Sequence, residues 1–144
     1  MKLIDFYNSP LQYDKINNTD AILTNPLSVV LHCKEQDIIL RISEGFIWNG
    51  NSGSFPYRFS KDNERYNVSI LCHDVFYHDL GISKSDADDI LRGCLRESGY
   101  NRFMAGLIHK AVQIFGNKSF GNIEHKSNID KIKMTMLKSG NAVL

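Results

Sequence analysis

Hydrophobic and polar residues follow a strand-like pattern in the first third of the chain. The run Leu27–Cys33 is dense in β-branched and apolar residues, and Ile38–Ile42 repeats that character after the polar residues 34–37. Two such runs joined by a short polar turn predict a β-hairpin. Residues 21–24 can add a third, shorter strand.

From about Glu64 the apolar spacing becomes helical. Three helices are predicted, running from about Glu64 to Asp79, from Ser83 to about Ser98 and from about Asn101 to Phe115. Ser83 is the expected N-cap of the second helix, with Asp86 completing a capping box. On the third helix, the expected core-facing residues are Phe103, Leu107, Ile108, Ala111, Ile114 and Phe115.

These elements predict an α+β fold, in which a small N-terminal antiparallel sheet (the hairpin) precedes a bundle of three helices containing an antiparallel helical hairpin. We expect one domain over residues 1–144. Its parts are a polar N-terminal arm (1–20), a β-hairpin region (21–48), a Gly-rich and aromatic loop (49–63), a helical core (64–116) and a polar C-terminal extension (117–144) with a short amphipathic segment from Ile129 to Leu137.

Composition narrows the class of protein. The 144 residues are 42% hydrophobic and 23% charged, which predicts an ordered globular core. A formal net charge of +1 provides no overall field for capturing nucleic acid or an anionic membrane, so we expect no nucleic-acid partner. Arg92, Arg96 and Arg102 are interpreted as a solvated face, because no aromatic or glycine pattern accompanies them.

The cysteines and the apolar runs indicate in which cellular compartment the protein is expected. Cys33, Cys72 and Cys94 are odd in number and lack C-x-x-C spacing, which indicates buried, reduced thiols rather than a disulfide framework or a zinc ribbon. The chain start interrupts its apolar run with Asp5 and Asn8, unlike a signal peptide. No stretch approaches the ~20 apolar residues of a membrane span, so we expect a soluble protein without a transmembrane segment.

The segment Leu71–His78 carries the candidate chemistry. On a helical wheel, the apolar residues of the first helix fill one arc, whereas His73, Asp74 and Tyr77 share the opposite side. If the first two helices are antiparallel, Asp88 stands at nearly the height of His73, because both lie about six residues from the turn, at ~1.5 Å rise per residue. A carboxylate beside an imidazole orients it and raises its basicity, as in general-base dyads.

The same residues also fit other roles. His73, Asp74 and Asp88 together would offer one nitrogen and several oxygens to a divalent ion. Alternatively, His73 is a hydrogen-bonded structural histidine and Tyr77 packs its ring. For the neighbours of this cluster we favour structural roles, in which Asp86 caps its helix, Asp89 is solvated and His109 packs against the third helix.

The loop GFIWNGNSGS, residues 45–54, is the second feature. It contains three glycines and two asparagines in ten residues, and such a backbone can approach a ligand closely or coordinate Ca²⁺. It lacks the Gly-Lys-Ser/Thr of a P-loop. Trp48 is either a buried plug or a wall facing a substrate.

The order of these motifs resembles a small phage and prophage family catalogued as a domain of unknown function. The matching stretches are Gly45–Ser52, His73–Tyr77, Ser83–Asp88 and Phe115–Gly116. The resemblance covers roughly residues 41–121 and implies a phage gene product without an established activity. Asn49 stands where that family usually has an acid, which weakens a metal-binding role for the loop, and Lys84 replaces its arginine.

A more distant resemblance is to secreted phospholipases A2, whose catalytic helix also has His-Asp-x-x-Tyr and follows a Gly-rich calcium loop. It implies that His73 activates water and that Asp74 binds Ca²⁺ together with loop oxygens. It further implies that Asp88 and Tyr77 orient His73.

Two hypotheses follow. The first is a phage-encoded hydrolase with His73, Asp88 and Tyr77 as catalytic residues and Asp74 with Asn49 as metal ligands. The cofactor would be a divalent cation, with Ca²⁺ favoured, and the substrate a lipid or cell-envelope bond. The second is a virion structural or assembly component in which the helices are only scaffold. The expected partners are other virion proteins or a host envelope component, and the expected location is the host cytoplasm during infection or the virion.

Overall fold

A computed structural model of the chain describes residues 1–17, 20–49, 60–122 and 126–142. It has an antiparallel sheet and three helices, which confirms the α+β prediction. The elements in chain order are β1 (Leu3–Asn8), β2 (Tyr13–Lys15), β3 (Asp20–Leu23), β4 (Leu27–Cys33), β5 (Gln36–Ile42), β6 (Ile47–Asn49), α1 (Glu64–Phe76), α2 (Lys84–Glu97), α3 (Arg102–Phe115), the short 3₁₀ helices η1 (Gly116–Lys118) and η2 (Lys126–Lys131), and β7 (Ile132–Lys138).

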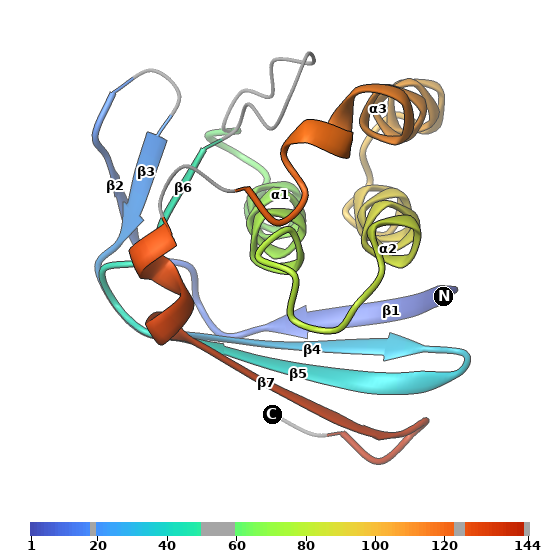
Figure 1. Cartoon of the computed structure of the whole chain (residues 1–144), viewed down its shortest axis with the longest axis horizontal. Helices are drawn as coiled ribbons and strands as arrows, with labels where there is room; N and C mark the ends of the chain where they lie inside the picture. The colour runs from blue at the N-terminus through green and yellow to red at the C-terminus, as the bar shows by residue number, and fades with distance from the viewer. Residues whose placement is uncertain (18–19, 50–59, 123–125, 143–144) are drawn as a thin grey trace.

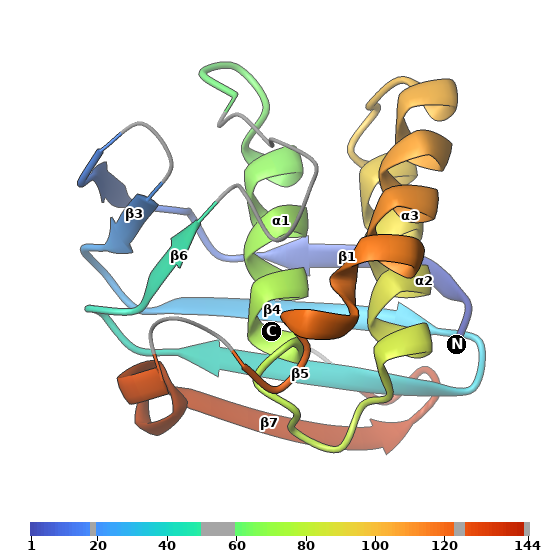
Figure 2. The same cartoon turned by 45° about the horizontal axis from the view of Figure 1, so that its top comes forward.

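The helices lie on one face of a four-stranded antiparallel sheet with the order β1-β4-β5-β7 (Figure 1). A second sheet, β2-β3-β6, stands beside α1 (Figure 2). The predicted hairpin is present as β4 and β5, and both strands direct alternate apolar residues to the helices. Val29, Leu31, Ile38 and Leu40 are all completely buried on that face.

The polar N-terminal arm predicted for residues 1–20 is wrong, because most of this segment is strand. β1 is an edge strand of the large sheet, and β2 pairs with β3. Leu3 and Phe6 both enter the core although they are three residues apart, since the register shifts between Leu3 and Asp5. This irregularity hid the alternation that identifies a strand.

The polar C-terminal extension predicted for residues 117–144 is also wrong. β7 takes up most of the amphipathic segment of this extension and pairs with β5 along its whole length. Residues after β7 turn over the outer face of the sheet, where Asp37 Oδ2 accepts hydrogen bonds from the backbone N–H groups of Gly140 and Ala142, at 2.9 and 3.0 Å. The C-terminal part is therefore built into the fold.

The predicted helices are present with close to their expected bounds, but one predicted face is wrong. On α3 the buried residues are Ala105, Ile108 and Val112. Four of the residues expected in the core are exposed instead, namely Phe103 (73%), Leu107 (43%), Ile114 (56%) and Phe115 (54%). The reason is that α3 is the outermost helix and packs on α2 rather than on the sheet (Figure 1).

Smaller expectations are met. The three cysteines are free and buried. Trp48 is completely buried and contacts Tyr13 edge-on, which favours the buried-plug interpretation. Of the Gly-rich and aromatic loop, residues 50–59 lie outside the described residues. In the part of the chain that is described, no helix has the length and apolar character needed to cross a membrane.

Candidate functional site

The centre of the candidate site is the Asp88 carboxylate, which joins the first two helices. Its Oδ1 atom lies 2.8 Å from His73 Nε2 and accepts a hydrogen bond of 2.7 Å from the Tyr77 hydroxyl. Its Oδ2 atom accepts a 2.7 Å hydrogen bond from Lys84 Nζ. The predicted meeting of His73 with Asp88 is confirmed, as is the placement of Tyr77 beside them.

Helical spacing explains why these groups converge. Tyr77 caps the end of α1 four residues after His73, and the two rings contact each other at a tilt of 46°, with a centroid distance of 4.1 Å. Lys84 and Asp88 have the same spacing on α2. The α1–α2 contact then brings the two pairs together.

The network extends to α3. Lys84 Nζ donates a second hydrogen bond, of 2.8 Å, to the carbonyl oxygen of Val112. Just beyond α3, Gly116 leaves room for the Tyr77 hydroxyl, since a Cβ atom at Gly116 would lie only 2.5 Å from that oxygen. Sequence reasoning missed both contributions. The Lys84–Asp88 spacing was a usable signal, whereas the Gly116 contact had none.

Burial determines the charges in this cluster. Asp88 and Tyr77 are completely buried, and His73 is 2% exposed. Burial lowers the pKa of His73, and this effect outweighs the opposing influence of Asp88. Burial alone would raise the pKa of Asp88, but hydrogen bonds from His73, Lys84 and Tyr77 hold it below its ordinary value.

These shifts specify the proton positions. Asp88 is ionised and pairs with the Lys84 ammonium, whereas His73 is neutral. Because His73 Nε2 faces a carboxylate, which only accepts hydrogen bonds, Nε2 carries the proton and donates it. The lone pair of the ring is then on Nδ1, which is the tautomer of a general base oriented by an acid.

Asp74 is buried at 4% exposure but stands apart from this network. Burial raises the pKa of its carboxyl group to about 8, and the negative charge of Asp20 adds to the effect. The backbone carbonyl of Asp74 accepts a 2.9 Å hydrogen bond from His78 Nδ1. The other ring nitrogen of His78, Nε2, is buried and has no partner within the described residues.

The predicted metal ligands, Asp74 and Asn49, both have Asp20 as a neighbour. Asp20 pairs with Asn49 across β3 and β6, and its charge acts on Asp74. Over residues 1–17, 20–49, 60–122 and 126–142, no three His, Cys, Asp or Glu side chains form a group able to hold a metal ion. Asp20 is itself bonded, because its Oδ2 atom accepts a 3.1 Å hydrogen bond from the side-chain amide of Asn17.

The residues expected to be structural make defined contacts. Ser83 caps α2 by accepting from the backbone N–H of Asp86 at 3.1 Å, as predicted, but the Asp86 carboxylate bonds the Met1 ammonium at 2.6 Å. Asp89 is not merely solvated, and His109 does more than pack, because Asp89 Oδ1 lies 2.9 Å from His109 Nε2.

No protein-family model matches the chain, and neither a curated protein nor a solved structure matches it. The interpretation of the site therefore depends on its own geometry and on the sequence resemblances.

Proposed function

We propose that the protein is a phage-encoded hydrolase in which His73 is the general base. The observation that carries the proposal is the hydrogen bond from His73 Nε2 to Asp88, since it leaves Nδ1 as a neutral proton acceptor. A general base must be unprotonated near neutral pH, and burial keeps His73 in that form.

In this proposal each neighbour of His73 has a separate role. Nδ1 takes a proton from an attacking water molecule, and Asp88 stabilises the imidazolium that forms. Tyr77 and Lys84 fix both oxygens of Asp88, so they act as positioning residues. Because His73 is 2% exposed, we expect a substrate to reach it only after neighbouring side chains move.

The proposed cofactor is a divalent cation, with Ca²⁺ favoured, held by Asp74 together with Asn49. The support is the pKa of about 8 for Asp74, because a buried carboxyl group with a raised pKa gains from a neighbouring cation. A bound Ca²⁺ would supply positive charge beside the developing oxyanion. The resemblance to phospholipases A2 favours an ester bond of a lipid, or another bond of the cell envelope, as the substrate.

Hydrolysis by matched histidine variants tests this function. We would assay a phospholipid and peptidoglycan with wild type, His73→Asn and His109→Asn, in Ca²⁺ and in EDTA. His109 is the matched control, since it is also a helical histidine bonded to an aspartate. We expect His73→Asn to lose about 100-fold or more of the activity and His109→Asn to stay within about twofold.

Two results would contradict the proposal. One is equal activity of wild type and His73→Asn, and the other is no hydrolysis of either substrate by wild type. In wild type, activity should also fall in acid, but only at a pH below the ordinary histidine pKa, because burial lowers the pKa at which His73 gains a proton.

A second candidate is a structural or assembly component of the virion. The observation that favours it is the exposure of Phe103, Leu107, Ile114 and Phe115 along α3, since clustered apolar residues on a surface mark protein interaction sites. Stoichiometric copies in purified particles would support this role. Detection only in infected-cell lysate would count against it.

A further inference from the structure

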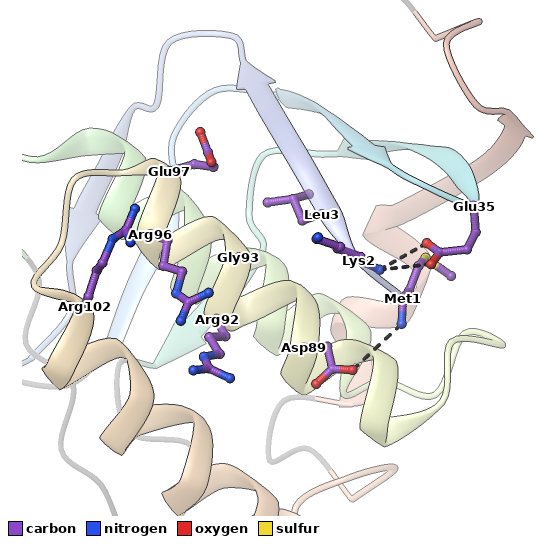
Figure 3. Close-up of a pocket in the computed structure, with 10 residues that line it drawn as sticks. All are labelled: Met1, Lys2, Leu3, Glu35, Asp89, Arg92, Gly93, Arg96, Glu97 and Arg102. Carbon is purple, nitrogen blue, oxygen red and sulfur yellow. Dashed lines mark hydrogen bonds and ion pairs between the residues drawn. The ribbon is translucent and has the colours of Figure 1, made fainter.

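A groove of about 480 Å³ lies where the start of β1 meets α2 and the first residue of α3. Its lining includes three arginines, Arg92 and Arg96 from α2 and Arg102 from α3 (Figure 3). We call it the basic groove. It shares no residue with the His73 site, so what it binds is independent of the proposed hydrolysis.

Close packing of β1 against α2 builds one wall of the basic groove. A Cβ atom at Gly93 would lie only 2.7 Å from the Cβ of Leu3, so the absence of a side chain lets the strand approach the helix. Arg92 and Arg96 lie on either side of Gly93, and their four-residue spacing places them on the same side of α2.

Among the described residues, the arginines of the basic groove are not paired with acids. In the described part of the chain, Arg92, Arg96 and Arg102 form no ion pair, and the Nε atom of Arg92 is buried without a hydrogen-bond partner. A buried guanidinium N–H without an acceptor is unfavourable. Because this Nε atom is closed off from solvent, an acidic ligand would instead bind the exposed guanidinium groups of Arg96 and Arg102.

The acidic residues of the groove do not compensate these arginines. Asp89 is bonded to His109 at 2.9 Å, and Glu35 accepts the backbone N–H of Lys2 at 3.0 Å. Figure 3 shows Glu97 pointing away from the guanidinium groups of Arg92 and Arg96. The lining carries five positive groups, namely the Met1 ammonium, Lys2 and the three arginines, against the three carboxylates, so the groove has a positive balance of charge.

We propose that the basic groove binds the phosphate group of a small phosphorylated molecule. Guanidinium groups match phosphate oxygens through paired hydrogen bonds, and three of them suit a doubly charged anion. The volume of about 480 Å³ falls within the range of small-molecule sites. None of the described residues that line the groove is aromatic, so they offer no ring on which a base could stack, which favours a phosphorylated small molecule over single-stranded nucleic acid.

Titration calorimetry with pyrophosphate at constant ionic strength tests the proposal. The variants are Arg92→Gln/Arg96→Gln, Arg92→Lys and the control Lys110→Gln, which changes an exposed charge on α3 outside the groove. Unfolding in phosphate-free buffer checks that each variant is folded. Sodium acetate and a single-stranded oligonucleotide serve as alternative ligands.

We expect wild type and Lys110→Gln to bind pyrophosphate alike. The double variant should bind it at least about tenfold more weakly, and Arg92→Lys should be intermediate, because lysine keeps the charge but not the paired geometry. Three results would overturn the proposal, namely no binding by wild type at millimolar pyrophosphate, equal binding by the double variant, or binding of the oligonucleotide without binding of pyrophosphate.

Discussion

α1 and α3 are nearly equal in length but use their surfaces in opposite ways. α1 buries the polar residues Asn67, Ser69, His73 and Asp74, whereas α3 exposes large apolar residues such as Phe103. Their positions explain the difference. α1 lies over the sheet between α2 and β6, so protein surrounds it, but α3 packs mainly on α2 (Figure 2).

The comparison shows that the layer in which a helix lies decides what is buried, more than its hydrophobic stripe does. A helix enclosed on all sides must satisfy its polar groups internally. On α1, His73 is bonded to Asp88, Asn67 to the carbonyl of Ser60, and Ser69 to the carbonyl of the preceding turn. An outer helix needs only a narrow apolar strip, which on α3 is Ala105, Ile108 and Val112.

The largest expected effect comes from removing the acid on which the α1 network depends. Asp88→Ala leaves His73, Tyr77 and Lys84 without their common partner, so we expect the free energy of unfolding to fall by about 3–5 kcal/mol. Asp89→Ala, at the neighbouring and partly exposed acid, should lower it by less than about 1 kcal/mol. Urea denaturation measures both, and equal losses would refute a central role for Asp88.

The second largest expected effect is the difference in stability loss between substitutions on the buried and on the exposed side of α3. Ile108→Ala opens a cavity and is expected to destabilise the fold by about 3 kcal/mol. Leu107→Ala, one residue earlier on the exposed side, should stay within about 0.5 kcal/mol of wild type. Thermal unfolding compares them, and a large loss for Leu107→Ala would show that its side chain is covered in solution.

Asp74, buried on α1, predicts that the stability of the fold depends on pH. A carboxyl group with a raised pKa holds its proton more tightly in the folded chain, so stability is greatest below the unfolded pKa of about 4. It falls as the pH rises toward about 8, the pKa of folded Asp74.

The matched pair for this test is Asp74→Asn and Asp79→Asn, the latter at an exposed acid. Between pH 5 and pH 7 we expect Asp74 to account for about 2–3 kcal/mol of the loss of wild-type stability. Asp74→Asn should remove that loss and Asp79→Asn should keep it. Urea denaturation at each pH gives the result, and parallel profiles for wild type and Asp74→Asn would contradict the raised pKa.

The smallest expected changes in stability come from the N-caps of α1 and α3. Asn63 accepts from the backbone N–H of Tyr66 and also donates to the carbonyl of Ser98, both at 3.0 Å. The Asn101 side chain accepts the cap bond from the backbone N–H of Met104, at 3.1 Å, and has no further bond to the described residues. We expect Asn63→Ala to destabilise by about 1.5 kcal/mol and Asn101→Ala by about 1 kcal/mol. Thermal unfolding measures the order, and a larger loss at Asn101 would contradict it.

Sequence patterns predicted the local elements and one long-range contact. β4 and β5 are rich in apolar residues, and Ser83 caps α2 as predicted. The His73–Asp88 contact followed from the tight connection, which sets two helices at matched heights. In these cases neighbouring residues determine the geometry.

The features that were missed depend on distant segments. β1 is disguised by its register shift, and β7 becomes a strand only because β5 accepts it. The basic groove forms only where β1 reaches α2 at Gly93. Lys84 bonds a carbonyl of α3, and that partner cannot be identified from spacing along α2.

The most direct test of the central claim is a ¹⁵N NMR titration of the His73 imidazole. The structure predicts a neutral ring at pH 7 with the proton on Nε2, and a pKa below the ordinary histidine value. His109 provides a second helical histidine in the same spectrum. A His73 ring that is doubly protonated at pH 7, or that carries its single proton on Nδ1, would contradict the assignment of His73 as a general base oriented by Asp88.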